Sequence, residues 1–194
     1  MITALSLLIT PARTWDRIAK ADRPIWHVLL LALLPLLLLS CAAEGYALIH
    51  WGEKSSEFGD VITTSKDLAI RHETVQIALG LVLVFLGSKF ILWVGEGFNF
   101  EPDYKQCFTL VAYSASPVFL ARFLDSLPAI NTWICWTIGA LGMMSVLYQG
   151  IAFVMQPSPT KGFGLYLLSA IVLVPLSGIC HLLALSVLHG KISF

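Results

Sequence analysis

The stretch VAYSASPVF, Val111 to Phe119, lies inside an apolar run that extends from about residue 106 to residue 124. The charged segment EPDYKQC leads into this run and the turn SLPAIN follows it. Small residues, two serines and a tyrosine surround Pro117, whose ring removes an amide donor and displaces the carbonyl of Tyr113. A proline at membrane depth is tolerated where neighbouring segments satisfy the freed backbone groups. The stretch therefore predicts a kinked helix in the middle of a membrane bundle.

Composition extends this prediction to the whole chain. Of its 194 residues, 57% are hydrophobic and 12% are charged, against roughly a quarter charged in soluble domains. The charges cluster in residues 1–23, 53–73 and 96–105, which leaves apolar runs of the roughly 20 residues that a membrane span needs. We predict an all-α polytopic membrane helix bundle with an N-terminal amphipathic helix and five spans, at residues 25–47, 74–94, 106–124, 132–155 and 165–188. Residues 1–24 form the lead-in and residues 25–190 the membrane domain.

The lead-in has the pattern of a helix at a membrane surface. Thr10 followed by Pro11 predicts a helix start. Trp15 is expected at the headgroup interface, and the basic side chains toward anionic lipid. These membrane-surface candidates are Arg13, Trp15, Arg17 and Lys20. An alternative of equal weight is a helix that only fixes topology.

The polar segments predict no metal or cofactor site. Residues 50–73 contain His50, His72 and five acids without ligand spacing, so we predict a solvated loop with a short interfacial helix around 61–71. Glu44 and Glu96 fall at the ends of their spans. The four cysteines have no CxxC spacing and are expected to pack. The run LLLLSCAA resembles a lipobox around Cys41, but the 25 residues before its apolar core favour an uncleaved span.

The basic residues predict the orientation of the chain. With the N-terminus inside, seven of the twelve basic residues lie on the cytoplasmic side, and four of them precede the first span. We predict a cytoplasmic N-terminus and a C-terminus on the opposite face.

Three prolines near the middle of their spans, Pro35, Pro117 and Pro175, free backbone carbonyls close to the bilayer midplane. The polar groups expected at that depth are Tyr113, Ser114, Ser116, Tyr148, Gln149 and His181. In one interpretation they line a small cavity, with His181, which titrates near neutral pH, as a proton or substrate contact. In the other, favoured interpretation, the prolines are ordinary kinks and His181 bonds to another helix.

Signatures of catalysis are absent from the sequence, which has no GxSxG, P-loop, GxGxxG or zinc motif. Gly139, Gly142 and Ser145 recur every three residues in the fourth span, which predicts close approach of another helix. This strip favours association between membrane helices over a reaction.

The segment WVGEGFNFEPDYKQC, the stretch VAYSASPVF and the following residues to VLYQGIAFVM resemble the Yip family of Ypt/Rab-interacting proteins, in particular its small bacterial inner-membrane members. The matching features are Tyr113, Ser114, Pro117, Pro128 and Tyr148 with Gly150. The resemblance implies a five-helix membrane domain with a cytoplasmic N-terminus. Eukaryotic relatives bind Rab GTPases, but their DLYGP signature and long N-terminus have no counterpart here, so GTPase binding is not expected.

These observations predict a non-enzymatic protein of the bacterial inner membrane, with its C-terminus in the periplasm. The expected role is a scaffold or adaptor that associates with itself or with other membrane proteins. The alternative is a small transporter or channel for an ion or lipid, and a third hypothesis is a lipid-sensing surface protein based on Trp15. The partners expected are the lipid bilayer and membrane proteins, and no nucleic acid or cofactor is expected.

Overall fold

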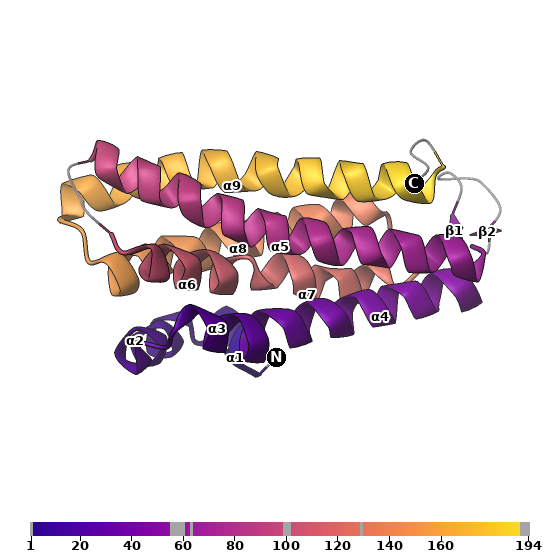
Figure 1. The fold of residues 1–194 in the computed structure, drawn as a ribbon, viewed down its shortest axis with the longest axis horizontal. Coiled ribbons are helices and arrows are strands. Elements are labelled where there is room, and N and C mark those ends of the chain that lie inside the picture. The colour runs from indigo at the N-terminus through magenta and orange to yellow at the C-terminus, as the bar shows by residue number, and fades with distance from the viewer. Residues whose placement is uncertain (1, 55–60, 63, 99–101, 129, 191–194) are drawn as a thin grey trace.

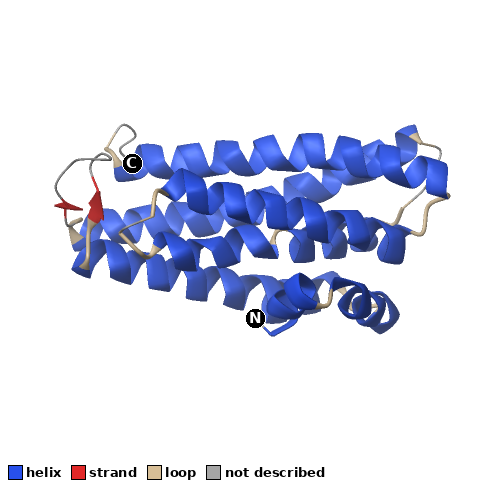
Figure 2. Ribbon diagram, turned by 180° about the vertical axis from the view of Figure 1, so that it is seen from behind, coloured by secondary structure: helices blue, strands red, loops and turns tan. Residues whose placement is uncertain are grey.

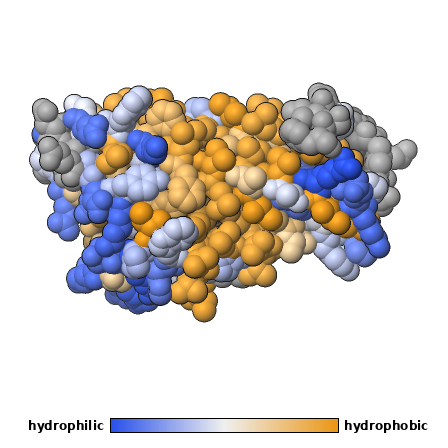
Figure 3. Space-filling model, in the orientation of Figure 1, coloured by the Kyte–Doolittle hydropathy of each residue, from blue (hydrophilic) through white to orange (hydrophobic). Residues whose placement is uncertain are grey.

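Five long helical segments run from one end of the molecule to the other in the computed structural model (Figure 1). The structure describes residues 2–54, 61–62, 64–98, 102–128 and 130–190. The segments long and apolar enough to cross a membrane are Ile25–His50, Lys66–Gly97, Tyr104–Asp125, Thr132–Met155 and Lys161–Leu188. Figure 3 shows an apolar band between two hydrophilic ends. The all-α, five-span architecture is therefore confirmed.

The first part of the chain forms two short helices and the first span. These elements are α1 (Ile2–Ile9), α2 (Pro11–Ala21), α3 (Ile25–Val28), the π-helical turn η1 (Leu29–Leu33) and α4 (Leu34–His50). After α4, β1 (Glu53–Lys54) pairs antiparallel with β2 (Val61–Ile62).

The remaining elements are α5 (Lys66–Gly97), α6 (Tyr104–Ser114), α7 (Ser116–Asp125), α8 (Thr132–Gly150), the π-helical turn η2 (Ile151–Met155) and α9 (Pro159–Leu188). Figures 1 and 2 show the β1–β2 hairpin and the end of α9 at one end of the bundle, and α2 at the other. We call these the hairpin end and the α2 end.

The third span, α6 and α7, is the centre of the bundle. Of its most apolar window 72% is buried, against 33% to 44% in the other four spans, and every residue of Val111–Phe119 is buried. The helix breaks at Ala115, before Pro117. The Ser116 hydroxyl donates to the carbonyl of Tyr113 at 2.7 Å, which gives the carbonyl displaced by Pro117 a donor within the same segment.

The other two prolines are accommodated differently. Pro35 follows the π-helical turn η1, in which the amide of Leu34 bonds to the carbonyl of Leu29. A π-turn before a proline absorbs the missing hydrogen bond without ending the helix. Pro175 lies within continuous α9.

The second span begins earlier than predicted, at residue 66 rather than 74. The Ser65 hydroxyl caps the helix by accepting the amide of Leu68 at 3.3 Å. The short helix predicted around 61–71 within a polar loop is therefore only partly right: residues 66–71 are helical, but Val61–Ile62 are a strand, and the helix continues through His72 and Glu73 into the second span. The first span likewise continues to His50.

Trp15 is enclosed by protein, so the prediction of a lipid-interface tryptophan is wrong. Its side chain is 0% exposed, and its indole N–H donates to the carbonyl of Val146 at 3.0 Å. It meets the Tyr113 ring edge-to-face and lies so close to Gly150 that a Cβ there would sit 2.6 Å from Trp15. The basic neighbours Arg13, Arg17 and Lys20 are exposed.

The small residues of α8 pack within the chain. A Cβ on Gly139 would lie 2.8 Å from Cα of Val118, and one on Gly142 would lie 2.8 Å from Cβ of Pro117. Gly139 and Gly142 therefore pack against α7, and Ser145 is the exposed member of this strip of three small residues. Gly139 is buried and Gly142 is only partly exposed, because α7 packs on both.

Candidate functional site

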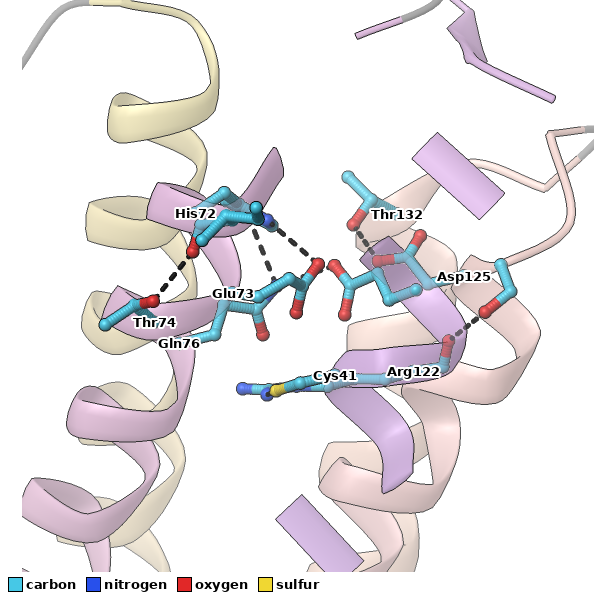
Figure 4. Close-up of polar contacts among 11 residues, drawn as sticks. Cys41, His72, Glu73, Thr74, Gln76, Arg122, Asp125 and Thr132 are labelled. Carbon is cyan, nitrogen blue, oxygen red and sulfur yellow. Dashed lines mark hydrogen bonds and ion pairs between the residues drawn. The ribbon is translucent and has the colours of Figure 1, made fainter. Parts of the chain in front are cut away.

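Four polar side chains meet inside the hairpin end of the bundle, and Figure 4 labels three of them, His72, Glu73 and Gln76. Glu44 comes from α4, and His72, Glu73 and Gln76 come from α5. Glu44 lies six residues before the end of α4, which is about 9 Å along the helix. Glu44, His72 and Gln76 are only 5%, 1% and 2% exposed. We call these four residues the Glu-His cluster.

The helix geometry explains why the cluster faces inward. His72 and Gln76 are one turn apart on α5, and their face continues through Gly80 and Leu83 into the core. Gly45 allows Glu73 to lie against α4, because a Cβ on Gly45 would be 2.9 Å from Cγ of Glu73.

A chain of contacts connects the four side chains. Gln76 Nε2 donates to Glu44 Oε1 at 2.6 Å and lies 3.3 Å from His72 Nε2. His72 Nδ1 lies 3.3 Å from Glu73 Oε1. A neutral His72 with its proton on Nδ1 is compatible with all three contacts, because Gln76 has two amide hydrogens to donate. Gln76 and His72 thus link the two carboxylates.

Each glutamate keeps one buried oxygen without a hydrogen-bond partner, Glu44 Oε2 and Glu73 Oε2. The other such side-chain atoms among the described residues belong to neutral groups, on Ser114, Trp136 and Ser169. Burying an unpaired carboxylate costs far more than burying a neutral polar group. The Glu-His cluster is therefore where the described structure lacks a positive charge or a proton.

Arg122 of α7 is the neighbouring cation. Its guanidinium donates to the sulfur of Cys41 at 3.1 Å, stands 5.6 Å from the centre of the Phe119 ring and attracts both Glu44 and Glu73 electrostatically. Figure 4 shows it reaching Cys41 beside the cluster. One arginine faces two carboxylates, so the local charge is not balanced by Arg122 alone.

A second polar group adjoins the cluster on the α7–α8 side. The Thr132 hydroxyl donates to Asp125 Oδ2 at 2.7 Å and lies 3.3 Å from His181 Nε2. A cavity of about 30 Å³ beside Arg122, Asp125 and His181 has room for about one water molecule.

A shallow groove between α4 and α5 leads from the outer surface to the cluster. Its volume is about 320 Å³, and Glu73 and Gly45 lie in its lining. The remaining lining is mostly apolar and mixes the small residues Cys41, Ala42, Ala69 and Thr74 with the larger Leu38, Tyr46, Ile49, Ile70 and Ile77. Within the membrane, this groove faces lipid or another protein.

The six predicted midplane residues, all of them described, do not form one group of contacts. Ser114 and Ser116 are buried beside Tyr113 in the third span. Tyr148 is 57% exposed and packs edge-to-face on Tyr166, Gln149 is partly buried, and His181 pairs with Thr132 toward the hairpin end. His181 of α9 thus contacts Thr132 at the start of α8.

The Glu-His cluster was missed because its residues were assigned to a loop and a span end. A signal was present. Ser65 begins SKDL, a helix-start pattern, and the buried face of α5 follows helical spacing from the first turn. Its buried residues are Ala69, His72, Gln76, Gly80, Leu83, Val84, Gly87, Ser88, Ile91 and Gly95.

The apolar helices and banded surface define a polytopic α-helical membrane protein. The model of the Yip1 domain matches residues 5–180, and the chain belongs to the Yip1 family. Members of this family are generally non-enzymatic membrane proteins. Comparison with curated proteins and comparison with solved structures each gave no match.

Proposed function

We propose that this Yip1-family protein is a non-enzymatic scaffold or adaptor that associates with a second copy or with other membrane proteins. The observation that carries the proposal is the filled interior around the third span, where Val111–Phe119 are all buried. A bundle packed through its centre leaves the outer helix faces as the surfaces for recognition.

The α4–α5 groove is the surface that best fits a neighbouring transmembrane helix. Small residues at such surfaces let helices approach closely, and Ala42 is exposed beside buried Cys41 and Gly45. Because α7 occupies Gly139 and Gly142, the proposal rests on this groove and not on the α8 strip.

Site-specific photocrosslinking in native membranes tests this association. A photoreactive amino acid at position 42 is expected to give an adduct of twice the 21.3 kDa chain mass, or an adduct with the same identified membrane protein in repeated experiments. The matched position 179, where Ile179 is 53% exposed on α9, is expected to give none. Monomer alone at position 42 contradicts the proposal.

A small ion or lipid transporter is the second candidate. The buried Glu-His cluster favours it, because ionisable groups inside a membrane protein mark ion pathways. Reconstituted vesicles with wild-type protein are then expected to show pH-dependent ion flux that falls in His72→Asn. Absence of flux above protein-free vesicles contradicts transport.

For localisation we propose the bacterial inner membrane, with the N-terminus in the cytoplasm. The exposed Arg13, Arg17 and Lys20 of α2 support this orientation, since positive charge favours the cytoplasmic face. A reporter that is active only in the periplasm should be active when fused after residue 190 and inactive when fused before residue 2. The reverse pattern contradicts the orientation.

A further inference from the structure

We propose that the Glu-His cluster binds one divalent transition-metal cation, with Glu44, His72 and Glu73 as ligands. Each of these residues offers a ligand atom, and the three atoms lie within 4.8 Å of one another. Binding of a metal through one ring nitrogen of His72 replaces the contact which that nitrogen makes with Gln76 or with Glu73. The proposal does not depend on the scaffold role, because it concerns the interior of a single chain.

The ligand chemistry favours zinc over magnesium or calcium. One imidazole and two carboxylates form a set that zinc accepts at about 2.0–2.2 Å, and three protein ligands leave a fourth position for water. Magnesium and calcium prefer oxygen ligands alone. In tetrahedral zinc two ligands stand about 3.4 Å apart, so a small change of side-chain torsions brings the three atoms into range.

The unpartnered oxygens point to a bound cation independently of the spacing. Glu44 Oε2 is buried without a partner on a residue that is 5% exposed, and Glu73 Oε2 is also without one. A divalent cation between these carboxylates neutralises their two charges and replaces the hydrogen bonds that they lack.

Gln76 and Gly45 complete the site without acting as ligands. The amide of Gln76 holds Glu44 Oε1 at 2.6 Å, as outer-shell partners orient metal-binding carboxylates. Gly45 leaves space for Glu73 to lie against α4 and to reach the cluster.

Zinc titration of the purified full chain in detergent tests the proposal. Chelator-treated protein is titrated with ZnCl₂ and its bound metal is counted by mass spectrometry. We expect one zinc per chain. Loss of an outer-shell partner typically weakens metal binding by about 10- to 100-fold, and Gln76→Ala should weaken zinc binding within that range. Loss of a ligand should cost more, so Glu44→Gln, His72→Asn and Glu73→Gln should each weaken zinc binding by more than about 100-fold.

Two variants control for zinc held on the surface. His50→Asn removes an exposed histidine of the hairpin end, and Glu96→Gln removes an exposed carboxylate near the far end of α5. Both should bind zinc as the wild type does. The proposal is overturned if wild type retains less than about a tenth of a zinc per chain, or if His72→Asn binds as tightly as wild type.

A measurement on the wild-type chain tests the proposal even if the variants fail to fold. X-ray absorption of the zinc-loaded wild type should show a nitrogen and oxygen shell that includes one imidazole. A shell containing sulfur, or one without imidazole, overturns the assignment of these ligands.

Discussion

The two ends of the bundle treat buried polar groups in opposite ways. At the α2 end, the buried indole N–H of Trp15 donates to the carbonyl of Val146 at 3.0 Å. At the hairpin end, two glutamate oxygens are buried without partners. The α2 end is thus held together by Trp15 packed against α8, a contact that we call the joint. The hairpin end instead contains buried carboxylate oxygens that no positive charge or hydrogen-bond donor of the described residues contacts. The following variants test this contrast, from the largest expected effect to the smallest.

Trp15→Ala should break the joint. The variant loses the most fully enclosed large side chain of α2 and its bond to α8, so the free energy of unfolding in micelles should fall by about 3–5 kcal/mol. The control Trp26→Ala removes a tryptophan that is 71% exposed and should have little effect in micelles. Equal losses in the two variants would show that α2 is not docked through Trp15.

Zinc should stabilise the hairpin end. At a free concentration about 100 times its dissociation constant, a ligand that binds only the folded state adds about 2.7 kcal/mol to the free energy of unfolding. We expect that gain in wild type and Trp26→Ala, and its loss in His72→Asn. Denaturant unfolding with ZnCl₂ and with chelator provides the comparison, and a gain that survives in His72→Asn argues against the site.

Gly150→Ala should crowd the joint. The new Cβ would lie 2.5 Å from Leu110 and 2.6 Å from Trp15, and overpacking of this kind costs about 1–3 kcal/mol. Gly97→Ala is the matched control, because a Cβ there meets nothing within 4 Å. Thermal unfolding of the two variants should separate them, and an unchanged melting temperature in Gly150→Ala contradicts this packing.

Glu44→Gln should raise the free energy of unfolding when the protein is kept metal-free by a chelator. The amide removes a buried charge, so metal-free protein should become more stable by about 1 kcal/mol, while the stabilisation by zinc disappears. Exposed Glu96→Gln should change neither quantity. Destabilisation of the metal-free variant would mean that the Glu44 carboxylate is already satisfied.

The sequence was sufficient for the five spans and for the kink at Pro117, because apolar run length and proline chemistry are local properties. It was insufficient for the joint and the cluster, which depend on distant pairs. Trp15 and Val146 are 131 residues apart, and Glu44 and Gln76 are 32 apart. A tryptophan beside basic residues has the same pattern at a lipid surface and in a helix joint, and only the packing of α8 distinguishes them.

The hydropathy pattern also placed the predicted start of the second span too late, at residue 74 instead of residue 66. Charges on Lys66, Asp67 and Arg71 separated the first turns of α5 from the span and assigned them to a short interfacial helix in a loop. The Ser65 cap and the spacing of Ala69, His72 and Gln76 instead continue into the span as one helix. Polar residues that continue the buried face of an apolar helix deserve to be included in that helix when its start is predicted.

The most direct measurement is the zinc content of wild type and of the double variant Glu44→Gln, Glu73→Gln, both purified after chelation and loaded with equimolar ZnCl₂. Circular dichroism should first establish equal helix content. The unpartnered carboxylate oxygens of Glu44 and Glu73 predict one zinc per wild-type chain and almost none in the double variant. Equal zinc content in the two proteins would contradict it.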